Sequence, residues 1–373
     1  MKIIISGGGT GGHIYPALTI MRTIEEKYPD TSFLYVGTHK GLEADIIPKE
    51  NIPFATVDIQ GFKRSLSPAN FVRAGLAAVG VAKAMNVVRK FKPDAVIGTG
   101  GYVCGPVLMA ASMLGIPTLI QEQNVVPGIT NKILAKFVTR IAAGTPEAEK
   151  HFPAGKVVCT GNPIRKAVLT ATREEGAKAF GFDPAKKTVL ISGGSRGARS
   201  INNAMVDVLV EAAKQREVQY LHVTGKLDYE DIIGHLAEKG VNLAETPNIK
   251  VEPYLYNMPQ AMAMADLVVY RAGATGLAEL TARGIPAILI PYPYAAENHQ
   301  EHNARALEAA GAAKVILNRE LKSDILQSTL QELLADDAKL ASMAAASKSL
   351  GKPQAAEDIA QMVIDMTQGR KTK

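Results

Sequence analysis

Short glycine-rich segments recur along this chain, and each follows a run of aliphatic or β-branched residues. A loop of this kind, between a strand and a helix, lets backbone N–H groups approach a phosphate at the amino terminus of the helix. Because the pattern is repeated, glycines that only make tight turns are the weaker explanation, and the segments predict a site for more than one phosphate group. They span residues 7–13, 98–106, 193–198 and 271–279.

The first segment contains the G-x-G-x-x-G pattern of dinucleotide-binding loops as Gly7, Gly9 and Gly12. A nicotinamide site also needs an acidic residue about 20 positions further on, at the end of the second strand, to bind the ribose hydroxyls. Residues 35–39, which end that strand, include no acid. The oxidoreductase interpretation is therefore disfavoured, whereas phosphate binding by the loop is not.

The fourth segment ends in Glu279, which is expected one turn inside a helix, where its carboxylate can accept both hydroxyls of a ribose. A glutamate near a helix amino terminus is also favoured by the helix dipole, so this residue alone does not establish a nucleotide site. Residues 291–303 are rich in amide and carboxyl side chains. Such a cluster suits the hydroxyls of a sugar.

Regular elements must position these segments, and short β-rich runs alternate with helical stretches throughout the chain. This alternation is typical of α/β domains with parallel sheets. Two sequence echoes indicate a pair of similar domains, because residues 1–9 resemble residues 187–195 and residues 115–120 resemble residues 284–290. The expected strands span residues 2–5, 33–36, 55–58, 95–97, 118–121, 140–142 and 156–159 in the first half and 188–192, 219–223, 249–252, 267–270, 287–291 and 313–317 in the second.

A length of 373 residues fits two domains of roughly 150 residues or more. We place the boundary at Gly161-Asn-Pro-Ile164, where turn-forming residues follow a strand and Pro163 interrupts any helix. The expected parts are an N-terminal domain over residues 1–160, a second domain over residues 161–350 and a terminal segment over residues 351–373. The terminal segment has a helical pattern and could cross back to the first domain.

Composition excludes several other classes of protein. The chain is 47% hydrophobic and 21% charged, which is ordinary for a soluble globular protein, and no stretch approaches the roughly 18 unbroken apolar residues of a spanning helix. The apolar run at residues 1–5 meets Gly7 too early for a signal peptide, so a cytosolic location is expected. Cys104 and Cys159 form no C-x-x-C motif, and neither a zinc site nor a redox pair is indicated.

The net charge of +6 belongs to the N-terminal half, where residues 61–92 contain seven cations and no acid, interleaved with apolar residues. This mixture suits an anionic membrane surface, and a buried helix with a solvated basic rim explains it equally well. With 5% aromatic residues, no Trp and a neutral second half, nucleic acid is the weakest candidate partner. The residues assigned to a membrane surface are Lys63, Arg64, Phe71, Arg73, Leu76 and Lys83.

These motifs resemble those of the GT-B glycosyltransferases and, within them, the bacterial family that adds N-acetylglucosamine to lipid I in peptidoglycan synthesis. The resemblance covers nearly the whole chain. Any one motif is weak, but their order and spacing together are highly specific. The residues that carry the resemblance are Gly8-Gly-Thr-Gly-Gly-His13, Gly100-Gly-Tyr102, Gly105-Pro106, Glu122-Gln-Asn124, Gly161-Asn-Pro-Ile-Arg165, Gly193-Gly-Ser195, Gly197-Ala198, Arg271-Ala-Gly-Ala274, Glu279, Asn298-His-Gln300 and Asn303.

The resemblance implies a GT-B fold, with two Rossmann-like parallel-sheet domains facing each other across a cleft. It implies transfer of N-acetylglucosamine from UDP-N-acetylglucosamine to the 4-hydroxyl of the N-acetylmuramoyl unit of lipid I, the undecaprenyl-diphosphate-linked muramoyl-pentapeptide, giving lipid II. The enzyme would be peripheral on the cytoplasmic face of the bacterial cell membrane, with anionic lipid and other cell-wall assembly proteins as partners. No cofactor is expected.

By the same resemblance, Arg165 and Ser195 would hold the donor diphosphate, Glu279 the ribose and the backbone near Leu255 the uracil. The expected donor residues are Thr10, Gly11, Gly12 and Asn124 in the first domain and Arg165, Ser195, Leu255, Ala274, Thr275, Gly276, Leu277, Ala278, Glu279, Gln300 and Asn303 in the second. The expected acceptor residues are Gly9, His13, Gly100, Gly101 and Tyr102.

Two positions depart from the pattern of this family. Arg196 stands where these enzymes usually carry Gln, which adds a cation beside the expected diphosphate. Gly276 stands where a Thr is usual, which removes a hydroxyl that the neighbouring Thr275 could supply.

Direct displacement at the anomeric carbon needs one base and one acceptor hydroxyl, so we expect inversion of configuration. His13 is the expected base, because a neutral imidazole can take the acceptor's proton near physiological pH. The alternative is a histidine that only hydrogen-bonds phosphate. No D-x-D pair lies on a strand-end loop to hold a metal, so helix amino termini and Arg165 are expected to stabilise the leaving group.

Three alternative functions stay open at this stage. One is a glycolipid synthase of the same superfamily that acts on diacylglycerol, and another is a UDP-N-acetylglucosamine 2-epimerase, which would have no use for the basic, apolar segment at residues 61–92. The third is a catalytically silent protein that binds nucleotide sugars in a cell-wall assembly. Loss of His13 or Glu279 would indicate the silent protein, and both residues are present.

Overall fold

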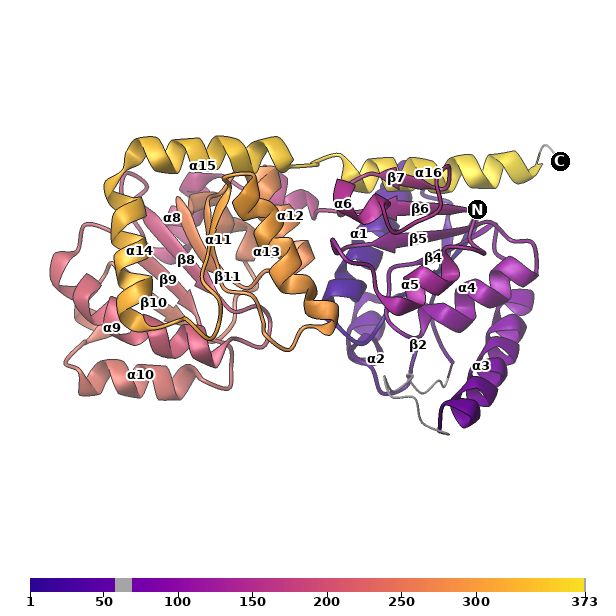
Figure 1. Ribbon diagram of the computed structural model, residues 1–373, viewed down its shortest axis with the longest axis horizontal. Helices are drawn as coiled ribbons and strands as arrows, with labels where there is room; N and C mark the ends of the chain where they lie inside the picture. Colours follow the sequence, from indigo (N-terminus) through magenta and orange to yellow (C-terminus); the bar gives the residue numbers. More distant parts are fainter. Residues whose placement is uncertain (58–68, 372–373) are drawn as a thin grey trace. The chain divides into compact units, whose positions relative to one another are not determined.

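The computed structural model describes residues 1–57 and 69–371 and divides into two compact units (Figure 1). Unit 1 combines Met1–Ile164 with Pro353–Lys373, and unit 2 is Arg165–Lys352. The chain therefore leaves unit 1 once and returns to it once.

Unit 1 is built on a seven-stranded sheet whose neighbouring strands all run parallel. The strands are β1 (Lys2–Ser6), β2 (Ser32–Gly37), β3 (Phe54–Thr56), β4 (Ala95–Gly98), β5 (Thr118–Glu122), β6 (Arg140–Ala143) and β7 (Val157–Cys159). Their order across the sheet is β3-β2-β1-β4-β5-β6-β7. The helices are α1 (Gly11–Lys27), α2 (Leu42–Ile46), the 3-10 turn η1 (Ile47–Glu50), α3 (Ala69–Phe91), α4 (Cys104–Met113), α5 (Ile129–Leu134), α6 (Pro146–Glu149) and α16 (Ala355–Lys371).

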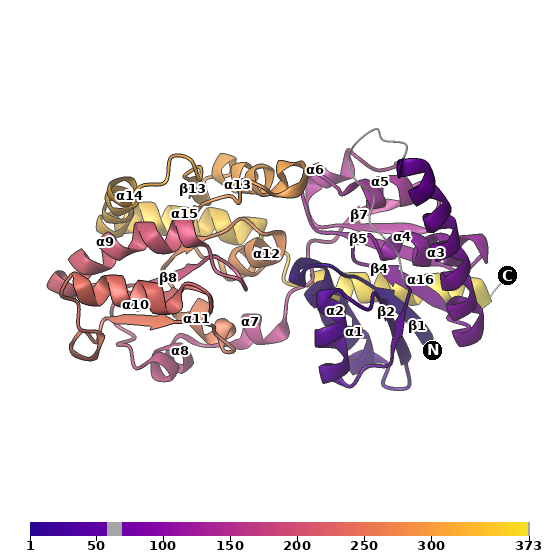
Figure 2. The ribbon, with the colours of Figure 1, turned by 90° about the horizontal axis from the view of Figure 1, so that it is seen from below.

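Helices cover both faces of this sheet, with α1 on one side and α3 and α4 on the other (Figure 2). Successive residues of β1 point to opposite faces, as the geometry of a strand requires. Ile3 and Ile5 pack in a cluster with α1 and α16, whereas Ile4 packs in a second cluster with α3, α4 and α5. Because both faces are buried, the strand reads as an unbroken apolar run.

Unit 2 repeats this plan on a six-stranded parallel sheet. The strands are β8 (Thr188–Ser192), β9 (Gln219–Val223), β10 (Ile249–Glu252), β11 (Leu267–Tyr270), β12 (Ala287–Leu289) and β13 (Ala313–Val315), in the order β10-β9-β8-β11-β12-β13. The helical elements are α7 (Lys166–Thr170), α8 (Arg173–Phe180), α9 (Arg199–Gln215), α10 (Tyr229–Glu238), η2 (Leu243–Glu245), α11 (Met258–Met264), α12 (Ala274–Arg283), η3 (Ala296–Asn298), α13 (His299–Ala309), α14 (Ser323–Ala335) and α15 (Asp337–Leu350).

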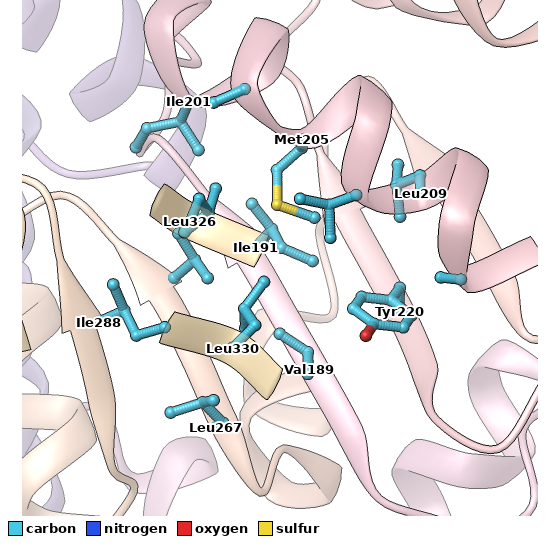
Figure 3. Close-up of a cluster of buried hydrophobic side chains, with 14 of the residues drawn as sticks. Val189, Ile191, Ile201, Met205, Leu209, Tyr220, Leu267, Ile288, Leu326 and Leu330 are labelled. Carbon is cyan, nitrogen blue, oxygen red and sulfur yellow. The ribbon is translucent and has the colours of Figure 1, made fainter. Parts of the chain in front are cut away.

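A buried cluster of unit 2 lies between its sheet and helices α9 and α14 (Figure 3). Val189 and Ile191 of β8 meet Ile201 and Met205 of α9, and Leu330 of α14 closes the cluster. All five side chains are at most 1% exposed. This packing fixes β8, and with it the glycine loop that follows the strand.

The prediction of two similar parallel α/β domains is confirmed. Each expected strand is present, with ends that differ from the expected ones by at most two residues. The two sequence echoes occupy equivalent places, because β1 and β8 are the third strands of their sheets and β5 and β12 lie two positions beyond them. β12 ends at Leu289 rather than at residue 291, since Pro291 has no N–H to donate to the sheet.

The basic segment at residues 61–92 is described in part. Lys63 and Arg64 lie outside the described residues, and Phe71, Arg73 and Leu76 fall where only the backbone of α3 is described. From residue 78 onward, Ala84 and Val88 are buried against α4, whereas Lys83, Arg89 and Lys90 are exposed. This part of α3 is a packed helix with a solvated basic rim. Across residues 1–57 and 69–371, no helix is both long and apolar enough to span a bilayer.

The C-terminal segment crosses back to the first domain, as the sequence allowed. Helix α16, yellow in Figure 1, packs against α1, and Ile359, Ala360 and Val363 lie in the same buried cluster as Ile3 and Ile5. The last helix of the chain thus completes the core around its first strand.

We expect Ile359→Ala to destabilise unit 1 by about 2–5 kcal/mol, because it leaves a cavity in a fully buried cluster. Urea-induced unfolding followed by circular dichroism would measure the shift in midpoint. Gln361→Ala is the matched control, since Gln361 lies on the exposed side of the same helix and should change the stability by less than about 0.5 kcal/mol. Equal midpoints for the two variants would mean that α16 does not pack against α1 in solution.

Candidate functional site

The first glycine loop joins β1 to α1 and has the form of an anion-binding helix terminus. Gly9 adopts a φ of 83°, which favours glycine, and α1 begins at Gly11 with Thr10 as its N-cap. The Thr10 side chain makes no capping hydrogen bond. Among the described residues no hydrogen bond from the Gly11 or Gly12 amide is found, so these two N–H groups and the helix dipole can receive an anion.

The second glycine loop, which follows β4, packs directly on the first. A Cβ atom at Gly100 would lie 2.7 Å from Cδ2 and 2.9 Å from Nε2 of His13, and a Cβ atom at Gly101 would overlap the carbonyl oxygen of Gly8. The Gly8 amide also donates to the Gly100 carbonyl at 3.3 Å. The structure therefore brings Gly9, His13, Gly100 and Gly101 together, and it supplies a packing reason for glycine at the last two positions.

His13 is half-buried in the first turn of α1 with a defined ring orientation. Its Nδ1 lies 2.8 Å from the Gly8 carbonyl oxygen and 3.3 Å from Thr10 Oγ1. Because a carbonyl oxygen only accepts, the hydrogen bond to Gly8 requires the proton on Nδ1, and the lone pair of the neutral ring is then on Nε2. Thr99 Oγ1 donates to the His13 carbonyl at 2.7 Å, which ties this turn of α1 to β4.

Glu43 was not predicted from the sequence as a site residue. Its carboxylate is buried against the first glycine loop. Its Oε2 accepts from the Gly9 amide at 2.9 Å, and its Oε1 accepts from the Thr38 amide at 3.0 Å and from Thr38 Oγ1 at 2.8 Å. Burial by itself raises the pKa of Glu43, but these hydrogen bonds outweigh burial, and the pKa is lower than that of an ordinary glutamate. The negatively charged Glu43 carboxylate therefore lies against the first glycine loop.

Asn124 follows β5 and is held by a second buried carboxylate. Glu122 Oε1 accepts from the Asn124 amide at 3.0 Å and from Asn124 Nδ2 at 3.2 Å, while Oε2 accepts from Asn131 Nδ2 at 2.8 Å. Gln123 Nε2 donates to the Thr99 carbonyl at 2.6 Å, so the loop after β5 is tied to the loop after β4. Tyr102 is 41% exposed beside these loops, where its ring can meet a ligand.

In unit 2, two residues with separate expected roles contact each other. Arg165, the N-cap residue of α7, and Glu279 of α12 form a bidentate ion pair, with Nε–Oε1 at 2.7 Å and Nη2–Oε2 at 3.0 Å. Glu279 is 5% exposed and Arg165 is 40% exposed. The paired charges fix the guanidinium next to the first turns of α12, a geometry that suits one ligand bearing both a ribose and a phosphate.

Arg271 is a half-buried cation that the sequence marked only as part of a motif. Its guanidinium donates to the carbonyls of Ile290 and Pro291 at 3.0 Å, to Asn318 Oδ1 at 2.9 Å and to Ser200 Oγ at 2.9 Å. Burial lowers the pKa of Arg271 to about 10, and Tyr292 acts in the opposite sense, so the group is charged at neutral pH. It links the ends of β11 and β12 to the start of α9.

The first turn of α12 explains one of the two departures from the family pattern. A Cβ atom at Gly276 would lie 2.8 Å from the Tyr270 ring, so a Thr at this position would require the ring to move. Burial also raises the pKa of Tyr270 to about 12, and the phenol is therefore neutral. Thr275 Oγ1 is buried and has no hydrogen-bond partner among the described residues, which leaves it available to a ligand.

The remaining expected donor residues of unit 2 lie on or next to the ends of its strands. Ser195 and Arg196 are exposed on the loop between β8 and α9, whereas Leu255 is buried after β10. On α13, Gln300 Oε1 accepts from the Tyr292 amide at 3.0 Å and Asn303 Nδ2 donates to the Ala272 carbonyl at 3.2 Å. The residues of the first two turns of α12 are Ala274, Thr275, Gly276, Leu277, Ala278 and Glu279.

Two family models match most of the chain. The N-terminal domain of glycosyltransferase family 28 matches residues 3–143, and the C-terminal domain of the same family matches residues 188–359. This chain belongs to glycosyltransferase family 28. In this family 28 enzyme, the region that matches the N-terminal domain model lies within unit 1, and the region that matches the C-terminal domain model lies mainly in unit 2.

Relatives of this family 28 enzyme match over nearly their full length. Identity is 48% to the UDP-N-acetylglucosamine--N-acetylmuramyl-(pentapeptide) pyrophosphoryl-undecaprenol N-acetylglucosamine transferase of Halothermothrix orenii, over 99% of this chain and 100% of that protein. It is 49% to the transferase of the same name from Listeria monocytogenes serovar 1/2a, over 98% of this chain and 99% of that protein.

Solved structures agree on the fold. A crystal structure of MurG from Acinetobacter baumannii is similar with a TM-score of 0.76 and 29% identity, over 98% of this chain and 99% of that one. A UDP-GlcNAc 2-epimerase from Neisseria meningitidis bound to UDP-GlcNAc has a TM-score of 0.69 at 15% identity, over 98% of this chain and 100% of that one, which is a likeness of fold alone. The expected GT-B class is confirmed.

We expect Glu279→Ala to weaken UDP binding by about 10- to 100-fold, because it removes an ionised acceptor worth about 1.5–3 kcal/mol and also releases Arg165. Isothermal titration calorimetry with UDP would measure the change. Asp266→Ala is the matched control, since Asp266 forms a similar bidentate pair with Arg173. Asp266 directly precedes β11, whereas Glu279 lies on the helix that follows this strand, so the control should leave UDP binding unchanged. UDP affinity that is unaltered in the Glu279 variant would refute the ribose assignment.

Proposed function

We propose that this family 28 glycosyltransferase moves N-acetylglucosamine from UDP-N-acetylglucosamine to the 4-hydroxyl of the N-acetylmuramoyl unit of lipid I, giving lipid II. The observation that carries the proposal is identity of 47–49% to transferases named for this transfer, over 97–99% of the chain. Because the matches include both units, they support a complete donor and acceptor machinery rather than one shared nucleotide domain.

We assign the donor mainly to unit 2. Glu279 accepts the ribose hydroxyls, and Arg165, Ser195 and Thr275 hold the diphosphate at the amino terminus of α12 and beside the loop after β8. Gln300 and Asn303 receive the sugar hydroxyls. The supporting geometry is the Arg165–Glu279 ion pair and the Thr275 hydroxyl, which has no hydrogen-bond partner among the described residues. Thr275 and Glu279 lie on consecutive turns of α12.

We assign the acceptor to unit 1, with His13 as the base. His13 Nε2 takes the proton of the acceptor hydroxyl while that oxygen forms its bond to the anomeric carbon and the bond from that carbon to UDP breaks, so the configuration inverts. The hydrogen bond from Nδ1 to Gly8 supports this role, because it puts the lone pair of the neutral ring on Nε2. The amides of Gly11 and Gly12 are available to the acceptor diphosphate or the donor sugar.

The charge that develops on UDP needs stabilisation, and we propose that it comes from the protein. The amino termini of α9 and α12 supply oriented N–H groups, and Arg165 supplies a cation that Glu279 holds in place. We therefore propose a transfer that needs no divalent metal ion.

The alternative functions are less well supported. An epimerase shares the fold, but a likeness at 15% identity says nothing of the reaction, whereas the identity to the transferases is threefold higher. A glycolipid synthase would use the same donor and differ in the acceptor. The transfer assay below separates it from the proposed enzyme.

The test is incubation of the full chain with radiolabelled UDP-N-acetylglucosamine and a short-chain lipid I analogue, with disaccharide product as the readout. His13→Ala should lower the turnover number by about 100- to 10,000-fold, as expected for loss of a general base, and leave donor binding nearly unchanged. Labelling of diacylglycerol but not of the lipid I analogue would overturn the proposed acceptor. Weakened UDP binding with intact turnover would mean that His13 only holds phosphate.

We propose that the enzyme works as a peripheral protein on the cytoplasmic face of the membrane, because its acceptor is anchored in the bilayer. Support comes from the part of α3 whose side chains the structure describes, where Lys83, Arg89 and Lys90 are exposed. Each lysine or arginine near an anionic surface contributes about 1 kcal/mol, and salt weakens the attraction.

Reversing Lys63, Arg64, Arg73 and Lys83 to Glu should abolish co-sedimentation with anionic vesicles at low salt and spare transfer to a short-chain acceptor. The matched control reverses four exposed cations of unit 2, Lys214, Arg216, Lys239 and Lys314, and should still sediment. Binding of the first variant at low salt would show that another surface meets the membrane.

A further inference from the structure

One peptide group in unit 1 is hydrogen-bonded at both of its ends. Its carbonyl, on Gly8, accepts from His13 Nδ1 at 2.8 Å, and its N–H, on Gly9, donates to Glu43 Oε2 at 2.9 Å. A carboxylate, a peptide and an imidazole thus form a continuous chain of hydrogen bonds. The order is carboxylate, N–H, carbonyl and then Nδ1–H.

The carboxylate at the end of this chain is shielded from solvent and fixed in position. Glu43 is 0% exposed, and the amide and hydroxyl of Thr38 hold its other oxygen. A Cβ atom at Gly8 would lie 2.6 Å from Glu43 Oε1 and 2.7 Å from its Cδ, so glycine at this position is what allows the carboxylate to reach the peptide. The contact is built into the loop.

We propose that Glu43 is a positioning residue that acts on His13 through the Gly8–Gly9 peptide. The proposal rests on the role of His13 as the base, given above. An anion that accepts from the N–H polarises the peptide and makes its carbonyl a stronger acceptor. The carbonyl then holds the Nδ1 proton and ring orientation, and it stabilises the imidazolium that forms when Nε2 takes a proton from the acceptor.

Two other titratable groups among the described residues, Cys104 and Tyr35, lie beside this loop and are neutral. Burial raises the pKa of Cys104 to about 11 and holds that of Tyr35 well above its ordinary value. Both side chains contact the backbone beside the loop, since Tyr35 donates to the Gly7 carbonyl at 2.7 Å and Cys104 Sγ donates to the Ser6 carbonyl at 2.9 Å. Glu43 therefore supplies the negative charge that these neighbours lack.

The kinetic test compares Glu43→Gln with Thr38→Val. The Gln side chain keeps the size of Glu43 but lacks its charge, and it cannot accept from both backbone amides at once. We expect a turnover number lower by about 10- to 100-fold, donor KM nearly unchanged, and the acidic limb of the pH–rate profile moved by roughly one unit toward lower pH. Thr38→Val removes a hydrogen bond to the same carboxylate and keeps the charge, so its acidic limb should not move.

A double variant tests whether Glu43 acts through His13. In the His13→Ala background, Glu43→Gln should lower turnover by less than about threefold further, because residues that act as a unit are not additive. A full additional loss in that background would show that Glu43 acts on the reaction by another route and would overturn the proposal.

A nuclear magnetic resonance measurement tests the relay without any activity. With ¹⁵N-labelled histidine, the His13 signals are assigned by their loss in His13→Ala and then followed through a pH titration in the wild type and in Glu43→Gln. We expect the Nδ1-protonated tautomer in the wild type and a titration midpoint that falls in the variant. Equal midpoints and tautomers would overturn the proposal. If the wild type transfers no sugar but the His13 titration midpoint is still lower in Glu43→Gln than in the wild type, the proposed function is overturned and the action of Glu43 on His13 stands.

Discussion

The two candidate sites depend on close approach between backbone and buried side chains, at positions that leave no room for a Cβ atom. Gly8 lies against the Glu43 carboxylate, Gly101 against the Gly8 carbonyl and Gly276 against the Tyr270 ring. Glycine-rich loops at the ends of parallel strands are usually explained by the approach of a phosphate. Here the glycines also join each loop to the structure behind it, so the amides that face a ligand are held by packing before any ligand arrives.

Charge behind the loops has opposite sign in the two units. Unit 1 keeps the anion of Glu43 beneath the loop that carries His13, where a base gains from a nearby negative charge. Unit 2 keeps the cation of Arg271 between the ends of β11 and β12 and the start of α9, next to loops assigned to an anionic nucleotide. Glu43 is fully buried and Arg271 half-buried, and each charge is held by several hydrogen bonds, which offset the cost of its removal from water. The local electrostatics of the two units thus match the proposed division between base and leaving group.

The sequence predicted strands better than contacts. Strands of a parallel sheet are buried on both faces and appear as short apolar runs between turn-forming residues, so β1 and β8 could be placed from residue types alone. The motif residues were likewise found, because they lie on loops at the ends of those runs. Glu43 was missed because two of its three hydrogen bonds come from the backbone amides of Gly9 and Thr38, and backbone groups leave no signature in a sequence. The pairing of Arg165 with Glu279 joins residues 114 positions apart, and only the fold brings them together.

The return of α16 to unit 1 affects how the chain can fold during its synthesis. Unit 2 is one continuous segment and can form its core as soon as residue 352 has left the ribosome. Residues 1–164 of unit 1 are made before unit 2, but unit 1 is completed after it, because Ile359 and Val363 cover its core only once they too have left the ribosome. Until then, part of the apolar core of unit 1 stays uncovered, and exposed apolar surface makes a nascent chain prone to aggregate.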